Sequence, residues 1–238
     1  YFTGLDGFCK GMFPIQPEGD LIWADGFVVV PDGSGNDRMV AHYLRLKGLN
    51  KPLARGLAIY NDDGHEFEKL RDLNLEEKWR FPHGHPVSFT NAAAAYFYFG
   101  VPFPNVRVPA SKQAILDTNP YEAFTCLPDG SSANTNSAKL LRNASGALAY
   151  RWTKFAPPTG PKEERAFISA GLMKPDEARF LPRDAVSGKT VQLHGGSVAW
   201  NEFRKKWIMV AVEIYGTSML GEIWYSEEDH PTGPWPKA

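Results

Sequence analysis

The side chains best suited to catalysis or binding lie at the starts, or openings, of three apolar runs. The openings read Trp23-Ala24-Asp25, His83-Gly84-His85 and His194-Gly195-Gly196. An ionised carboxylate can act as a base and can accept hydrogen bonds from hydroxyl groups, and an imidazole can donate or accept near neutral pH. We therefore expect a polar site around Asp25 whose other members come from the three openings: Trp23, His83, His85, His194 and Ser197.

The histidines suggest a rival chemistry. His83 and His85 are two residues apart, so on a strand both imidazoles would lie on one face. Together with His194 and Asp25 they could hold a metal such as Zn²⁺. The alternative is that the imidazoles bind hydroxyl groups or complete buried hydrogen bonds. We predict no cofactor, and the sequence leaves a structural or site metal ion open.

The elements that must position these residues are strands in repeated units. In the last unit, residues 192–238, the apolar runs Gly195–Trp200, Lys206–Glu213 and Gly221–Glu227 are rich in aromatic and β-branched residues and have short connectors. Such runs are typical of an antiparallel meander. Residues 21–70 and 81–154 repeat the pattern more weakly, and self-similar units of this size are typical of β-propeller blades. We predict an all-β propeller, with a β-sandwich as the alternative.

The remaining elements follow from apolar runs and breaking residues. Strands are predicted at Trp23–Val30, Met39–Leu46, Leu57–Tyr60, His65–Leu70, Val87–Thr90, Ala95–Val101 and Ala147–Lys154, with another strand in the run Tyr121–Leu127. Pro102, Pro104 and Pro109 should interrupt pairing. Residues 1–20 read as an irregular lead-in, residues 111–118 as a helical turn and residues 131–143 as a loop. Residues 156–183 read as a helical insertion, because Pro161 and two glutamates open an amphipathic segment that Gly171 ends.

Composition excludes several classes of protein. The formal net charge is −1, which indicates neither a nucleic-acid partner nor an anionic membrane surface. No apolar run approaches the roughly 18 residues of a membrane-spanning helix. Cys9 and Cys126 are the only cysteines, and we expect free, buried thiols. No Gly-x-Ser-x-Gly elbow marks a serine nucleophile.

The string Ser226–Trp235, SEEDHPTGPW, resembles the outer-strand turn of the five-bladed propeller glycoside hydrolases. That superfamily includes arabinanases, β-xylosidases and invertase-type enzymes, and its blades often end in a Ser-acid-x-Pro-x-Gly-Pro-aromatic turn. The opening Gly84-His85-Pro86-Val87 is similar to their Asp-Pro-aliphatic openings, with His85 where Asp would stand. The resemblance covers residues 21–238, and within this superfamily the chain looks most like a bacterial branch. It implies one five-bladed-type propeller domain over residues 1–238, in which either the set of blades is incomplete or some blades are too degenerate to recognise.

The resemblance implies hydrolysis of a poly- or oligosaccharide. That chemistry needs one carboxylate kept ionised and one acid with a raised pKa, about 6.5–9.5 Å apart in inverting enzymes. Asp25 is the candidate base, and Glu222 or Glu213 is the candidate acid. No Glu-Gly-Pro opening marks the family's usual acid; the nearest string is Pro17-Glu18-Gly19. A non-catalytic propeller that binds carbohydrate or protein is the alternative, the oligomeric state stays open, and a secreted or periplasmic location is favoured.

Overall fold

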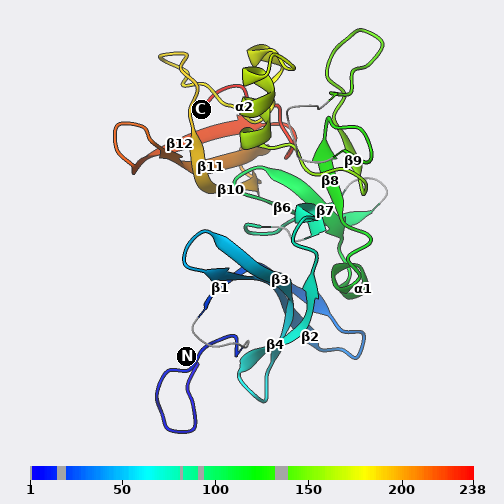
Figure 1. The fold of residues 1–238 in the computed structure, drawn as a ribbon, viewed down its shortest axis with the longest axis vertical. Helices are drawn as coiled ribbons and strands as arrows, with labels where there is room; N and C mark the ends of the chain where they lie inside the picture. The colour runs from blue at the N-terminus through cyan, green and yellow to red at the C-terminus, as the bar shows by residue number, and fades with distance from the viewer. Residues whose placement is uncertain (1, 15–19, 81–82, 91–93, 132–138) are drawn as a thin grey trace.

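Strands dominate the computed structural model, which describes residues 2–14, 20–80, 83–90, 94–131 and 139–238. The strands form three antiparallel sheets, so the prediction of a mostly β protein is confirmed. Figure 1 shows the sheets in chain order along the long axis of the molecule, with the longest helix beside the third. The chain therefore builds its layers one after another from consecutive segments.

The first sheet has the strand order β1-β2-β3-β4. Its strands are β1 (Leu21–Pro31), β2 (Asp37–Lys47), β3 (Lys51–Asn61) and β4 (Glu66–Leu73). All four were predicted, and each is longer than its predicted range. The pairing of β1 with β2 shifts between Asp25 and Val28, and this irregularity turns the chain next to the candidate carboxylate.

The second sheet has the order β5-β6-β7-β8-β9. Its strands are β5 (Val87–Thr90), β6 (Ala95–Gly100), β7 (Pro104–Pro109), β8 (Glu122–Thr125) and β9 (Arg151–Thr153). The prediction that prolines interrupt pairing here was wrong for β7. Pro104 and Pro109 occupy its two ends, where a missing N–H costs little, and the residues between them pair with both neighbours.

The third sheet contains β10 (Leu193–Asn201), β11 (Lys206–Ile214) and β12 (Leu220–Glu228), in that order. These strands match the three predicted runs of the last unit. One face of this sheet carries apolar side chains that are accessible to solvent. Val210, Ile223 and Tyr225 on this face are 44 %, 68 % and 46 % exposed.

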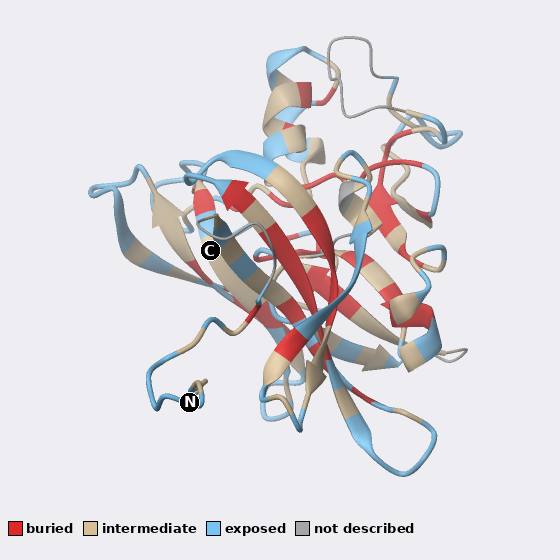
Figure 2. Cartoon of the chain, turned by 60° about the horizontal axis from the view of Figure 1, so that its bottom comes forward, coloured by how far each residue is buried: buried red, intermediate tan, exposed pale blue. Residues whose placement is uncertain are grey.

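Apolar contacts between neighbouring sheets hold the three layers together. Val28, Val40 and Leu57 of the first sheet pack with Phe99 and Val106 of the second. A second cluster joins the third sheet to the other side of the second; it contains Phe103, Phe124, Val198, Trp207, Met209 and Trp235. Figure 2 shows buried residues concentrated along these strands. The burial of these apolar faces is the main contribution of packing to the stability of the fold.

The helices are short. α1 (Lys112–Leu116) buries Ala114 and Ile115 against the first cluster, and a 3₁₀ helix, η1 (Lys78–Arg80), precedes the second sheet. α2 (Pro161–Ser169) and the 3₁₀ turn η3 (Pro175–Glu177) form the predicted helical insertion. Phe167 of α2 packs with Cys126 and Leu127, so the insertion supports the end of the second sheet. No helix in the described ranges is long and apolar enough to cross a membrane.

A buried carboxylate ties the insertion to the sheets. Glu164 of α2 is fully buried and accepts hydrogen bonds from the Tyr150 hydroxyl (2.6 Å), Arg179 N–H (2.9 Å) and Phe180 N–H (2.9 Å). Burial raises the pKa of Glu164, although these three donors oppose that change. The carboxylate therefore fixes the chain at residues 179–180 in one position relative to α2.

Some predictions fall on residues that the structure does not describe. They are parts of the lead-in (residues 1 and 15–19, which include Pro17-Glu18-Gly19), the start of the second unit (residues 81–82) and most of the predicted loop (residues 132–138). Both cysteines are free. Cys126 is buried as expected, but Cys9 is exposed, because it pairs with Thr3 in a short bridge outside the sheets.

We expect Glu164→Gln to lower the free energy of unfolding by roughly 1–3 kcal/mol, the cost of a buried unsatisfied donor. Whichever way the glutamine amide is turned, its NH₂ faces the backbone N–H of Arg179 or Phe180. Denaturant unfolding measures the change, with Glu76→Gln at an exposed position as the matched control. Equal stabilities for the two variants would show that the Glu164 contacts contribute nothing net.

Candidate functional site

Asp25 joins the first sheet to the segment that leads into the second. One carboxylate oxygen, Oδ1, accepts hydrogen bonds from the backbone N–H of Gly26 (2.8 Å) and of Gly84 (2.9 Å). The other, Oδ2, lies 3.2 Å from Nδ1 of His83. Burial alone would raise the pKa of Asp25, but the hydrogen bonds from His83, Gly26 and Gly84 prevail and lower it. The carboxylate is therefore ionised at neutral pH.

Gly84 is required at this junction by its surroundings. Its φ is +87°, and a Cβ there would lie 2.0 Å from the carbonyl oxygen of Gly100. Only glycine combines this backbone conformation with so close an approach. The close approach places the Gly84 N–H and the His83 ring next to Asp25, so the predicted His-Gly opening has a direct physical reason.

A buried histidine lies behind the junction. His42 pairs with Asp25 across β1 and β2 and is fully buried. Its Nδ1 lies 3.4 Å from the carbonyl oxygen of Gly26, and its Nε2 lies 3.2 Å from the Tyr121 hydroxyl. Burial lowers the pKa of His42 to about 4, so its ring is neutral at pH 7. His42 was not among the candidate residues identified from the sequence, because it reads there as one more polar residue in an alternating strand.

Trp23 places an aromatic ring on the same strand as Asp25. It stands two residues before Asp25, and both belong to the same face of β1 because their side chains alternate. Trp23 is 50 % exposed, and the side chains of Asp25 and His83 are 35 % and 42 % exposed. The indole and the ionised carboxylate thus share one face of β1, the imidazole contacts the carboxylate, and solvent reaches all three.

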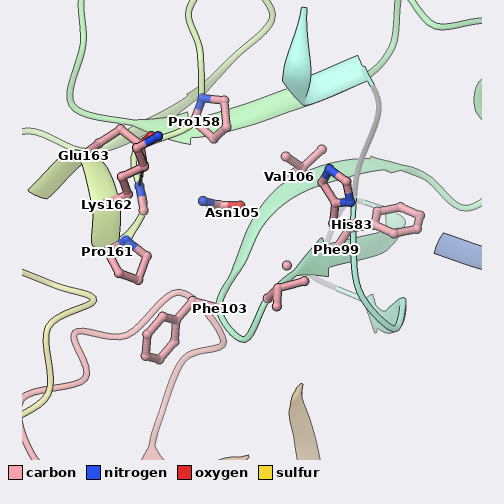
Figure 3. Close-up of a pocket in the computed structure, with 12 residues that line it drawn as sticks. His83, Phe99, Phe103, Asn105, Val106, Pro158, Pro161, Lys162 and Glu163 are labelled. Atoms are coloured by element: carbon pink, nitrogen blue, oxygen red, sulfur yellow. Dashed lines mark hydrogen bonds between the residues drawn. The ribbon is translucent and has the colours of Figure 1, made fainter. Parts of the chain in front are cut away.

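A cavity of about 260 Å³ opens next to His83 (Figure 3). Its polar lining includes Asn105 of β7 and Lys162 and Glu163 at the start of α2. Figure 3 shows Asn105 between His83 and the two α2 residues. Asn105 donates to the Thr159 carbonyl (3.3 Å), and Glu163 accepts from the Gly160 N–H (3.1 Å). These three residues were not among those singled out from the sequence, because their strand was read as broken by prolines and their helix as an insertion without site residues.

The other predicted residues stand on or near other strands. His85 is exposed between His83 and β5, while His194 is exposed and Ser197 half-buried on β10. Glu213 and Glu222 meet each other at the β11–β12 end of the third sheet: a Cβ on Gly216 would lie 2.8 Å from Oε2 of each. Glu213 accepts from Trp224 Nε1 (2.8 Å), and Glu222 from the Thr217 N–H (3.2 Å). These contacts put both glutamates in a local network of the third sheet.

The predicted metal alternative gains no support from this geometry. Among the described residues, no three His, Cys, Asp or Glu side chains are grouped so that they could hold a metal ion. His83 is directed to Asp25, whereas His85 and His194 are exposed on separate segments. The polar groups that do converge are suited to hydrogen bonding with a ligand.

We expect Gly84→Ala to destabilise the protein more than Gly188→Ala. Both glycines have positive φ, which costs an alanine roughly 1–2 kcal/mol. Only at Gly84 would the new Cβ also meet backbone, since nothing lies within 4 Å at Gly188. Denaturant unfolding of the two variants separates the clash from the backbone strain, and equal losses would mean that Gly100 moves aside freely.

The buried His42 predicts a pH dependence of stability. Its pKa is about 4 in the folded protein and about 6.5 when unfolded. The associated stability, roughly 3 kcal/mol, is fully present above pH 6.5 and is lost as the pH falls towards 4. Unfolding measured across this range should show that slope, and His42→Gln should reduce it. An NMR titration in which the His42 ring protonates near pH 6.5 would contradict the prediction.

Comparison with known proteins identifies no family for this chain. No protein-family model matches the chain, and no curated protein matches it. The resemblance to the five-bladed propeller glycoside hydrolases therefore stays a prediction, and the residues of the junction between the first two sheets are the basis for a function.

Proposed function

We propose that this protein is a carbohydrate-binding domain of the propeller glycoside-hydrolase type, with Trp23, Asp25 and His83 at its site. The observation that carries this proposal is the ionised Asp25 carboxylate, held by His83 and two backbone N–H groups beside a half-exposed indole. A sugar ring has an apolar face that stacks on an aromatic ring and hydroxyl groups that bind carboxylates and imidazoles.

The sheet arrangement supports the propeller part of the proposal. The three sheets are consecutive meanders, each begins at an edge strand (β1, β5 and β10), and neighbours pack through apolar faces. Blades of a propeller are related in the same way. In a propeller, a further blade would cover the exposed apolar face of the third sheet around Val210, Ile223 and Tyr225.

Hydrolysis of the bound saccharide is the second candidate function. A general base would take a proton from the attacking water, and a general acid would give one to the leaving oxygen. Asp25 suits the first role because it is ionised. Glu163 is a carboxylate that lines the same cavity as His83, so it is the candidate for the second role, whereas Glu213 and Glu222 contact each other on the third sheet.

We expect Asp25→Asn and Trp23→Ala to weaken carbohydrate binding by about tenfold each, because one loses the charge and the other the stacking surface. The amide oxygen that Asp25→Asn introduces can still accept the two backbone hydrogen bonds, so the junction should stay folded. Affinity electrophoresis and calorimetry against soluble plant and algal polysaccharides measure binding. Phe203→Ala, which removes an exposed aromatic ring from the β10–β11 turn, is the control and should bind normally.

Aryl glycosides in the same panel distinguish the two functions. Hydrolysis that is lost in Asp25→Asn would establish the enzyme, and binding without turnover would establish the binding domain. Saccharide binding that both site variants retain in full would exclude this junction as the site.

A further inference from the structure

A second cavity, of about 440 Å³, lies where the edge strands β5 and β10 end. We call it the aromatic pocket; its lining residues are Ser88, Phe89, Thr90, Trp200, Trp207, Asp229 and His230. Its volume falls within the roughly 300–1,000 Å³ typical of small-molecule sites. His83 precedes β5, whereas the pocket is at the other end of that strand, so the two sites are separate.

Three aromatic rings form the wall of the pocket. Trp207 is only 3 % exposed, and its ring makes edge contacts with Phe89 (5.4 Å between centroids) and with Trp200 (5.7 Å). Trp200 itself is 40 % exposed. The pocket thus presents the Trp200 indole to solvent, and the buried Trp207 ring on the neighbouring strand packs against it.

Two contacts restrict the exposed indole. Trp200 Nε1 donates to the Glu202 carboxylate (2.8 Å), and the Trp200 backbone pairs with Trp207 in the β10–β11 ladder. A ring fixed at both its backbone and its N–H loses little further freedom when a ligand stacks on it. This preorganisation distinguishes Trp200 from isolated exposed aromatic residues such as Phe203.

The rim of the pocket is polar and close to neutral. Ser88 and Thr90 are exposed on β5, and His230 follows β12. Asp229 Oδ1 accepts from Lys206 Nζ at 2.5 Å, so the two charges offset each other. An aliphatic ligand would make no hydrogen bonds with these rim groups. An anion would be repelled by the Asp229 carboxylate, and a cation would have to compete with Lys206 for that carboxylate. A neutral ligand with one apolar face and several hydroxyl groups uses both the wall and the rim.

We propose that the aromatic pocket is a second carbohydrate site, in which a pyranose ring stacks on Trp200 and its hydroxyl groups bind the rim. This inference rests on the ligand class of the proposed function but needs none of the residues at the Asp25 junction. Two sites at opposite ends of the edge strands would let the domain engage two points of a polysaccharide, or two chains.

The test uses the full chain and soluble xylo-, cello- and manno-oligosaccharides, followed through the Trp200 indole N–H resonance in NMR spectra. We expect a saturable shift of that resonance in the wild-type protein and in a Trp23→Ala/Asp25→Asn double variant. Trp200→Ala and Trp200→Phe lack this resonance, so calorimetry in the double-variant background measures their affinity. Trp200→Ala should weaken binding by about tenfold, while Trp200→Phe keeps an aromatic face and most of the affinity. Phe203→Ala should leave it unchanged, and thermal unfolding checks that each variant is folded.

The outcomes separate the two sites. No saturable shift at Trp200 with any of the oligosaccharides would overturn the aromatic pocket, and so would undiminished binding by Trp200→Ala in the double-variant background. Binding at Trp200 with no effect of Trp23 or Asp25 substitutions on total binding would support the pocket and contradict the junction site. The wild-type signal at Trp200 provides a result even if Trp200→Ala does not fold.

Discussion

The buried Glu164 carboxylate is the interaction on which the upper half of the molecule depends. By holding residues 179–180 it positions the Arg179 side chain, which lies over Tyr150 and donates to the carbonyl oxygens of Thr232 and Gly233. The backbone of Arg179 in turn accepts the N–H of Trp235. Trp235 is fully buried between the second and third sheets. The Glu164 carboxylate therefore connects α2, the turn at residues 232–235 and the apolar cluster between the second and third sheets.

The same region shapes the cavity beside His83. Lys162 and Glu163 line that cavity and immediately precede Glu164, so the contacts that fix α2 also fix them. On the opposite wall, the Asp25 contacts with Gly84 and His83 hold the first sheet against the start of the second. The same side chains thus line the cavity and make tertiary contacts, and this double role favours preorganisation of the polar groups. The aromatic pocket repeats this principle with packed rings in place of hydrogen bonds.

Much of the fold could be predicted from the sequence. The apolar runs identify the strands of the first and third sheets, and the proline-led segment identifies α2. β7 could not be predicted, because Pro104 and Pro109 mark strand ends in this protein and breaks in many others. From the repeated openings we expected His83, His85, His194 and Ser197 near Asp25, and of these His83 contacts it. Asn105, Lys162 and Glu163 join the same region only through packing between segments far apart in the chain, for which the sequence carries no local signal.

The sequence by itself determined the local elements, since alternation, glycine turns and proline positions act over a few residues. It also determined which side chains could do chemistry at the openings. The tertiary structure alone decided that Asp25 meets His83 while Glu213 and Glu222 meet each other on the third sheet. It also decided that His42 is buried and Trp200 exposed over a cavity. The physical reason is that burial and cavity shape arise from how sheets pack on one another, and packing depends on the faces of all three sheets together.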